Sequence, residues 1–268
     1  MRKAQKDKII YTVLLVLCIV IFWAIEQYFW SPEFKIKEQA EVEIPEYVYP
    51  ETQKAKIVKH NHYALVYNEE HEQAQWVVYG LFRSHLTSDD RQRPYFIEDP
   101  KVKSGSADWR NYKNSGYDRG HLCPAGDRRF SESAYNETFY TSNISPMNRE
   151  FNAGIWNRLE IQVRNWARQY DSLWVVTGGI LTDDLPDIGY ESVSVPEAFY
   201  KIVIRGSEDQ LEAIAFLIPH RESTLPLNEF RVTVDSIEQL SGVDFFEALD
   251  DKLESKLESR VNGSVWRY

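Results

Sequence analysis

The sequence predicts an α+β domain built around a central antiparallel sheet and preceded by one N-terminal transmembrane helix. Runs of β-branched and aromatic residues of strand length recur between residues 63 and 218, and long irregular stretches separate most of them. Few helical patterns lie between these runs, which argues against the regular strand–helix alternation of a parallel sheet. One uncharged apolar run near the start of the chain predicts the membrane helix.

The first thirty residues form a unit of their own. The uncharged run Ile9–Ile25 is followed by aromatic residues at 28–30 and preceded by four basic residues, Arg2, Lys3, Lys6 and Lys8. With its aromatic extension this run can span a hydrocarbon core of about 30 Å. The basic flank places the N-terminus in the cytoplasm, as in a single-pass protein of a bacterial inner membrane, and the remaining chain in the periplasm or outside the cell. A cleaved signal peptide is the alternative, but no small-x-small cleavage site follows the run.

The rest of the chain divides into a linker and one folded domain. Residues 31–56 are charged, spaced by prolines and aperiodic, which indicates a linker, and residues 57–268 form the domain. Alternating β-branched and aromatic residues predict strands, the first two as a hairpin, at Tyr63–Tyr67, Trp76–Tyr79, Leu173–Thr177, Phe199–Ile204 and Ala213–Ile218. Apolar residues at helical spacing predict helices over Ala153–Gln169 and Phe245–Leu257.

Charge is distributed unevenly along the chain. The net charge of −10 excludes a protein that coats nucleic acid by bulk attraction. Residues 101–170, however, hold eleven Lys and Arg against seven Asp and Glu, a net charge of +4. A basic segment in an acidic chain fits a local phosphate-binding site. Cys123 is the only cysteine outside the apolar run, so no disulfide forms within the domain, and we interpret Cys123 as a packed small residue rather than a thiol nucleophile.

The densest set of catalytic residue types lies between Tyr117 and Asp127 and includes Asp-Arg-Gly-His at 118–121. Hydrolysis of a phosphodiester needs a base for water, a cation beside the phosphate oxygens, and help for the departing oxygen. His121 is largely neutral at working pH because its ordinary pKa is about 6.5, so it can take the proton. Arg119 can bind phosphate oxygens with its planar guanidinium. We interpret Asp118 as a structural carboxylate that fixes Arg119 or nearby backbone.

The helix predicted after residue 152 supplies oxygen ligands. Asn152 lies at its start and Glu160 lies eight residues later, about 12 Å along the axis. Both side chains can converge on one hydrated ion, although direct ligation by both is disfavoured. We therefore expect Asn152 to bind Mg²⁺ directly, since Mg²⁺ prefers oxygen and keeps most of its waters, and Glu160 to act through water. Arg164, four residues after Glu160, is placed to hold that carboxylate.

Three linked motifs carry a family resemblance. Asp-Arg-Gly-His, Ser-Asn-Ile-Ser-Pro and Asn-x-Gly-x-Trp-x-x-Leu-Glu, in this order and spacing, resemble the DNA/RNA non-specific endonucleases, which include bacterial sugar-non-specific nucleases and endonuclease G. The resemblance extends from about residue 63 to residue 249. It implies a ββα-metal (His-Me finger) nuclease fold, in which a histidine on a strand faces an asparagine at a helix start.

The resemblance also implies roles for individual residues. His121 is the expected general base and Asn152 the direct ligand of Mg²⁺, with Mn²⁺ as a substitute. Asn143 is expected to support the site through hydrogen bonds, and Glu160 to orient water on the metal. A further arginine that stabilises the transition state corresponds to Arg93, although Arg91 is close enough in sequence to stay an alternative.

Several of these residues also have simpler interpretations. Asn143 can be a turn or helix cap, and Glu160 with Arg164 an exposed ion pair. The histidines at 60, 62 and 71 hint at a zinc site, but no fourth ligand lies near them in the sequence. His85 and His220 are expected in loops, and the aromatic residues of the 153–169 helix in the core.

The sequence thus predicts a metal-dependent endonuclease that acts on DNA and/or RNA and is held at a membrane by its N-terminal helix. Two other functions remain open at this point: a membrane-tethered nucleic-acid-binding module without catalysis, and a metal phosphodiesterase acting on small phosphoesters.

Overall fold

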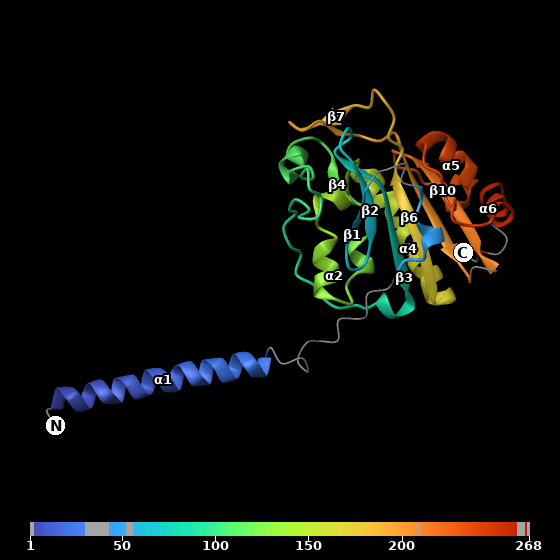
Figure 1. Ribbon diagram of the computed structural model, residues 1–268. Coiled ribbons are helices and arrows are strands. Elements are labelled where there is room, and N and C mark those ends of the chain that lie inside the picture. Colours follow the sequence, from blue (N-terminus) through green and yellow to red (C-terminus); the bar gives the residue numbers. More distant parts are fainter. Residues whose placement is uncertain (1–2, 30–42, 52–55, 208–209, 262–265, 267–268) are drawn as a thin grey trace. The chain divides into compact units, whose positions relative to one another are not determined.

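The computed structural model of the chain describes residues 3–29, 43–51, 56–207, 210–261 and 266 (Figure 1). The chain divides into two compact units, Met1–Glu41 and Val42–Tyr268. Helix α1 (Lys3–Phe29) belongs to the first unit. The second unit contains the sheet and all the other described elements.

The structure does not support the predicted transmembrane helix at Ile9–Ile25. The contiguous described side chains of α1 run from Ile10 to Ala24 and are solvent-exposed, and the ends of the predicted segment lie outside them. No helix among the described residues is long and apolar enough to cross a membrane. The location of the folded domain outside the cytoplasm stays a prediction.

Residues 31–42 and 52–55 of the predicted linker lie outside the described residues. The part between them, 43–51, packs against the folded unit instead of extending from it. Val48 is buried, and the backbone N–H of Glu51 donates to the carbonyl of Asp244 at 2.9 Å. Apolar side chains within this charged stretch, Ile44 and Tyr47 among them, explain the packing because they cover the edge of the core.

Seven strands form one sheet in which every neighbouring pair is antiparallel, which confirms the predicted α+β class. In spatial order they are β1 (Ile57–Lys59), β2 (Ala64–Asn68), β3 (Gln73–Phe82), β6 (Ser172–Gly179), β9 (Ala198–Arg205), β10 (Glu212–Pro219) and β11 (Arg231–Val232). Each strand predicted from β-branched and aromatic residues forms, and β2 and β3 form the predicted hairpin.

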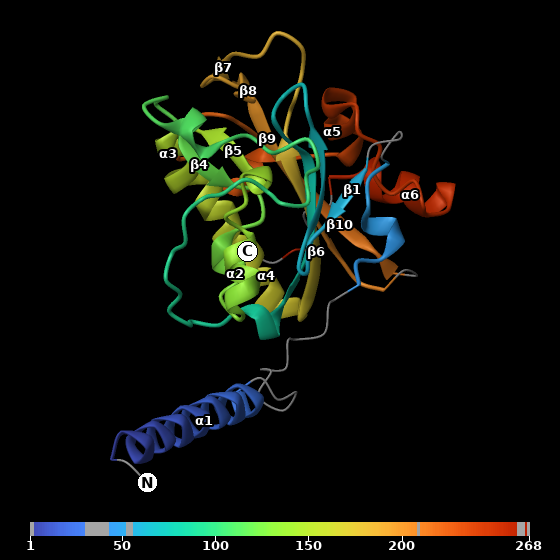
Figure 2. The same cartoon turned by 60° about the vertical axis from the view of Figure 1, so that its left-hand side comes forward.

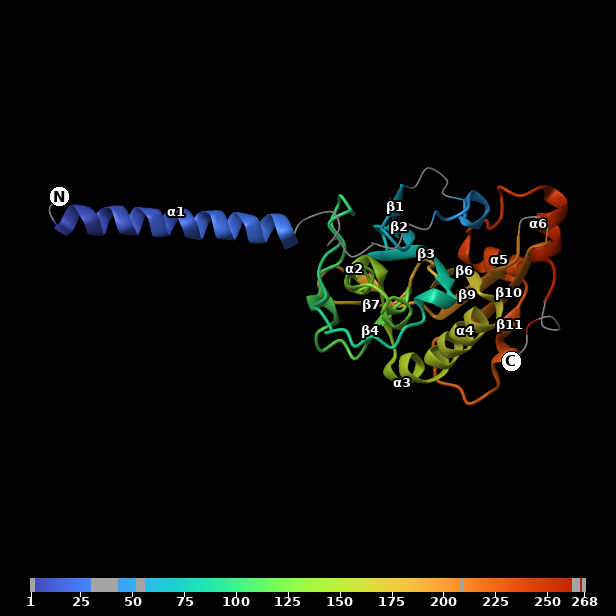
Figure 3. The ribbon, with the colours of Figure 1, turned by 90° about the horizontal axis from the view of Figure 1, so that it is seen from below.

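Side chains on the two faces of the sheet enter two separate cores because strand residues alternate in direction. On one face, Val77, Val175 and Val203 pack against helix α4 (Asn157–Tyr170). On the other, Val78 and Val176 pack with residues of α5 (Val234–Ser241) and α6 (Asp251–Glu258). Figure 3 shows α4 and α5 on opposite sides of the strands.

The helices differ from the sequence expectation at their starts. The helix predicted at 153–169 consists of α3 (Arg149–Phe151), one turn of π-helix (Asn152–Trp156) and then α4. The helix predicted at 245–257 begins only at Asp251, because Phe246 has a φ of 65°, outside the helical region, and Asp250 provides the N-cap. Helix α5, capped by Thr233 and ended by left-handed Gly242, was not predicted.

A second, two-stranded sheet carries the Asp-Arg-Gly-His motif. It consists of β4 (Asp118–His121) and β5 (Ile144–Met147), paired antiparallel with His121 opposite Ile144. These two strands lie next to α3 (Figure 2). The remaining elements are α2 (Glu132–Glu137), β7 (Asp187–Ile188) and β8 (Val193–Ser194). The order β4, β5, helix is the strand–strand–helix unit that the family resemblance implies.

Candidate active site

A pocket of about 290 Å³ lies where β4, the loop after it and the helical segment 152–164 meet. Three of the predicted site residues, His121, Asn152 and Glu160, line it together. The other lining residues are Pro124, Ala125, Gly126, Ala153, Asn157 and Arg164. The fold therefore brings the predicted base and the two predicted oxygen donors to one place, while their chemical roles stay predictions.

Strand β4 holds His121 through close packing. Gly120 lies against Met147 on β5, where an added Cβ would come within 2.2 Å of the methionine Sδ. Glycine is therefore required beside the histidine. The His121 ring packs against Phe96 and Phe139, with ring centroids 5.6 and 4.9 Å away. Its Nε2 is buried and has no hydrogen-bond partner among the described residues.

The His121 ring is held in its neutral form. Burial, and to a lesser extent the positive charge of Arg93, lower the pKa of His121 to about 3. The imidazolium ion would lose hydration on burial and would face a like charge, so both effects favour the imidazole. A neutral ring has one free nitrogen lone pair, which is what a base requires.

The two predicted phosphate-binding arginines share one aromatic ring. The guanidinium carbon of Arg119 lies 5.1 Å from the Phe96 ring and 5.5 Å from that of Trp109. The guanidinium of Arg93 lies 5.4 Å from the same Phe96 ring. No sequence pattern indicated Phe96, whose ring contacts His121 and both arginines.

Arg91 is directed elsewhere. Its Nε donates to the carbonyl of Arg129 at 2.9 Å, and its guanidinium pairs with Asp89 at 3.2 Å. The charge of Arg93 is one cause of the lowered pKa of His121, and Arg91 is not among the causes. The geometry thus favours Arg93 over Arg91 as the arginine beside the base.

Asn143 acts on the backbone behind the histidine. It is fully buried, and its Oδ1 accepts from the N–H of Cys123 while its Nδ2 donates to the carbonyls of Cys123 and Thr138. The backbone carbonyl of Asn143 also accepts from Leu122 N. These bonds fix the two residues that follow His121, and Asn143 does not line the pocket. These contacts fit the supporting role that the resemblance implies for Asn143, and that role stays a prediction.

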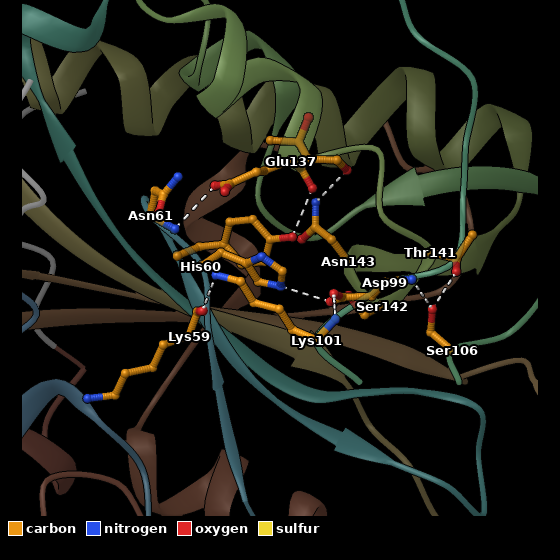
Figure 4. Close-up of polar contacts among 12 residues, drawn as sticks. Lys59, His60, Asn61, Asp99, Lys101, Ser106, Glu137, Thr141, Ser142 and Asn143 are labelled. Atoms are coloured by element: carbon orange, nitrogen blue, oxygen red, sulfur yellow. Dashed lines mark hydrogen bonds and ion pairs between the residues drawn. The ribbon is translucent and has the colours of Figure 1, made fainter. Parts of the chain in front are cut away.

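A buried polar network holds the segment that contains Asn143 (Figure 4). His60 Nε2 lies 2.8 Å from Asp99 Oδ2, and the same carboxylate accepts from Ser142 Oγ at 2.5 Å. Ser106 Oγ accepts from Asp99 N at 2.7 Å and lies 2.8 Å from Thr141 Oγ1. These bonds tie the turn before β2 and the loop at 99–106 to the residues just before β5.

The histidines suggested as zinc ligands do not converge. His60 bonds to Asp99, whereas His71 Nδ1 lies 2.9 Å from Ser194 Oγ. His62 packs against Phe130, as does His85. Among the described residues, the groups of three side chains placed to hold a metal contain carboxylates alone.

Glu160 lies near three other charged side chains, those of Asp127, Arg164 and Lys201. Burial raises the pKa of Glu160 to about 7; Lys201 and Arg164 oppose this rise, and Asp127 adds to it. Arg164 was expected to hold Glu160, but its nearer partner is Asp127, at 2.8 Å against 3.9 Å for Glu160. The i, i+4 spacing allows Arg164 to approach Glu160. The shorter ion pair of Arg164 is nevertheless with Asp127, which lies in the segment after β4.

Lys201 is a charged residue that the sequence analysis did not assign to the site. It is fully buried on β9, where its Nζ donates to Thr177 Oγ1 at 3.2 Å and lies 4.6 Å from the Trp156 ring. Burial lowers the pKa of Lys201 to about 8, and Glu160 is the strongest opposing influence. A lysine inside the apolar run Phe199–Ile204 is the signal that could have identified it, because unpaired lysines are rarely fully buried.

Asp118 does not hold Arg119. Its Oδ1 accepts instead from Arg149 at 3.1 Å, in a partly exposed pair that joins β4 to α3. This contact is neither of the two that were expected, and the structural role of Asp118 stays a prediction. His220, expected to be an ordinary loop histidine, bonds to the N-terminal end of α3.

The donor set of the pocket fits a hard divalent cation. Asn152 and Glu160 offer an amide and a carboxylate oxygen to the same pocket, and the unpartnered His121 Nε2 is buried within it. Few protein ligands and an open pocket suit Mg²⁺, which retains several waters. A larger hollow of about 960 Å³ is lined by Lys59 and four glutamates, at positions 43, 46, 51 and 247, and its net negative charge would repel a phosphate.

Known proteins are similar to this chain in sequence and in fold. The family model for DNA/RNA non-specific endonucleases matches residues 41–252. The mitochondrial nuclease EXOG of Xenopus laevis is 38% identical over 212 residues, which cover 71% of this chain and 58% of that protein. Human mitochondrial endonuclease G is 33% identical, with 71% of this chain and 69% of that protein covered.

A solved structure agrees with these matches. The crystal structure of the EndoG/EndoGI complex superposes with a TM-score of 0.67 at 31% identity, and the match covers 73% of this chain and 87% of the other. The chain spans about six tenths of the length of the EXOG proteins it matches. Because the family model covers most of the chain, including every residue of the pocket, this protein belongs to the DNA/RNA non-specific endonuclease family.

Proposed function

We propose that the protein is a Mg²⁺-dependent, sequence-non-specific endonuclease that hydrolyses phosphodiester bonds of DNA and/or RNA, with Mn²⁺ able to replace Mg²⁺. The observation that supports this most directly is the shared pocket, in which the unpartnered nitrogen of His121 is buried beside the oxygen donors Asn152 and Glu160. Nucleic-acid binding alone requires none of these three side chains.

His121 is the proposed general base. In the free protein its pKa of about 3 keeps it neutral but makes it a weak base. A phosphodiester anion bound beside Arg93 offsets the charge of that arginine, and so raises the pKa of His121 towards its ordinary value. Substrate binding thereby strengthens the base at the moment when it must take a proton from the attacking water.

The remaining side chains grip phosphate and cation. Arg119 and Arg93 would hold the non-bridging oxygens, Asn152 would bind Mg²⁺ directly, and Glu160 would act on it through water. When bound, Mg²⁺ would offset the negative charge on the phosphate and on the departing 3′ oxygen. Cleavage of the bond between phosphorus and that oxygen would leave a 5′-phosphate end. Because these groups contact the phosphate and none of them reads a base edge, sequence selectivity is expected to be loose.

A plasmid-nicking assay on the full chain tests this proposal. We expect cleavage in Mg²⁺, loss of cleavage in EDTA, and a fall of at least about 100-fold in His121→Ala, the contribution typical of general acid–base catalysis. His71→Ala, at a histidine remote from the pocket, is the matched control. Salt-sensitive binding without cleavage would indicate a binding module instead. A strong preference for bis-p-nitrophenyl phosphate over DNA would indicate an esterase of small phosphates.

A further inference from the structure

The helix that carries Asn152 is bent at Gly154, which has φ −97° and ψ −107°. The bend changes the direction of the chain between Asn152 and Glu160, so the relative placement of these two side chains depends on how it is held. The segment 219–225, which begins at the last residue of β10, contacts the bent helix at three points. We call this segment the 219–225 clamp.

Glu222 provides the contact at the bend itself. Its Oε2 accepts a hydrogen bond of 2.9 Å from the backbone N–H of Ile155. A Cβ built on Gly154 would lie 1.8 Å from the same oxygen. Glycine at position 154 therefore makes room for the carboxylate, which in turn satisfies a backbone donor in the π-helical turn.

His220 provides the contact at the start of the helix. Its Nε2 accepts from the N–H of Asn148 at 2.6 Å, and its Nδ1 lies 2.8 Å from the carbonyl of Pro196. An amide N–H can only donate and a carbonyl can only accept, so the ring is neutral with its proton on Nδ1. Asn148 is the N-cap of α3, and its carbonyl accepts from Asn152 N at 2.8 Å. His220 thus fixes the residue on which the first turn, and Asn152 with it, is built.

Arg158 closes the clamp on the far side of the bend. Its guanidinium donates to the carbonyls of Ser223 and Leu225, the latter at 3.2 Å. Arg158 lies two residues before Glu160 on α4. The clamp therefore holds the helix before Asn152, between Asn152 and Glu160, and next to Glu160.

We propose that His220 and Glu222 are positioning residues that set the placement of Asn152 and Glu160 opposite His121. This proposal rests on the proposed function, since it assigns the two residues to the same metal pocket. Neither side chain lines that pocket. They act through the backbone of the bent helix, and a site that must be accurate to about 0.5 Å depends on such supporting contacts.

The experiment compares Glu222→Ala and Glu222→Gln in the full chain. It measures Mn²⁺ affinity by isothermal titration calorimetry, the Mg²⁺ dependence of plasmid cleavage, and the thermal midpoint in EDTA. Loss of supporting contacts typically lowers metal affinity by about 10- to 100-fold, which is the loss expected for Glu222→Ala. Glu222→Gln keeps an oxygen that can accept from Ile155 N and should retain most of the affinity. Glu229→Ala removes an exposed carboxylate nearby and is the matched control.

The outcomes separate this proposal from the proposed function. Wild-type Mn²⁺ affinity in Glu222→Ala would overturn the role of the clamp, as would an equal loss in Glu222→Gln. Equal Mn²⁺ binding by wild type and Asn152→Ala would instead overturn the metal site itself. If Glu222→Ala does not fold, His220→Ala measures the same effect from the other contact, with affinity loss expected there and wild-type affinity counting against the proposal.

Discussion

The side-chain amide of Asn143 forms two hydrogen bonds with the backbone of Cys123: Oδ1 accepts from Cys123 N at 2.8 Å, and Nδ2 donates to Cys123 O at 3.0 Å. This pair fixes the chain directly after the predicted base. It also explains why an asparagine, with a donor and an acceptor on one planar group, is needed there.

We therefore expect Asn143→Asp to lower the stability of the protein strongly, although aspartate and asparagine have nearly the same size. A carboxylate keeps the acceptor for Cys123 N but places negative charge against two carbonyls, those of Cys123 and Thr138. An unsatisfied buried polar group costs roughly 1–3 kcal/mol and a charged one more. Urea denaturation should show a larger loss of stability for Asn143→Asp than for Asn143→Ala. The reverse order would show that the two donated bonds contribute little.

Asp127 is expected to be a principal stabilising charge beneath the pocket. It is almost completely buried and pairs with Arg164. Removing one member of a buried pair leaves the other without compensation and costs about 3–5 kcal/mol. We predict a loss of that order for Asp127→Ala in chemical denaturation. Arg83→Ala, which breaks the exposed Arg83–Asp171 pair, should cost less than about 1 kcal/mol.

Arg93 should influence the titration of His121 in a way that Arg91 does not. Removing Arg93 removes one of the two causes that lower the pKa of His121, so Arg93→Ala should raise that pKa. It should stay below 6.5, since burial is the larger cause and remains. NMR titration of the His121 ring measures this directly. Arg91→Ala is the control, and an equal shift in both variants would remove the distinction between the two arginines.

Stability should fall in acid because of buried neutral histidines. Burial lowers the pKa of His85 to about 3 and that of His62 to about 4, with Arg128 adding to both shifts. The unfolded chain therefore binds more protons than the folded one between about pH 4 and 6.5. The stabilisation is fully present above pH 6.5 and is lost as pH falls through the folded-state pKa values.

A variant isolates this effect. Each additional proton taken up on unfolding changes the free energy of unfolding by about 1.4 kcal/mol per pH unit. His85→Phe keeps a ring to stack on Phe130, whose centroid lies 3.9 Å away, but cannot titrate. Its unfolding free energy should depend less steeply on pH between 4 and 6.5 than that of wild type. An unchanged slope would show that His85 takes no part.

Local sequence patterns were sufficient for five of the seven strands of the main sheet and for the pocket residues that lie close in sequence. β-branched and aromatic alternation predicts β2, β3, β6, β9 and β10 because burial on a sheet has a period of two. Asn152 and Glu160 could be paired because eight residues of one helical segment separate them by only about 12 Å, although the sequence did not predict the bend at Gly154 that lies between them. Asp127 and Lys201 could not be assigned to the same place from the sequence. Their proximity to Glu160 depends on which loop and which strand the tertiary fold packs against α4.

The bend at Gly154 illustrates the same limit. Periodicity predicts one continuous helix over 153–169, because apolar spacing shows which face is buried and not whether the axis is straight. The space that Glu222 occupies next to Gly154 is set by the strand order, which brings the end of β10 to this helix.

The clamp at 219–225 also bears on how far the chain can be shortened. Arg93, Arg119, His121, Asn143, Asn152 and Glu160 all precede Tyr170, so a fragment ending there would retain every motif by which the family is recognised in this chain. It would lack β6, the strand that pairs with β3, together with Lys201, His220 and Glu222. Such a fragment would contain the complete signature without the contacts that hold the bent helix. The role proposed for the 219–225 clamp therefore predicts that the smallest active unit of this protein extends beyond residue 225, well past its last motif.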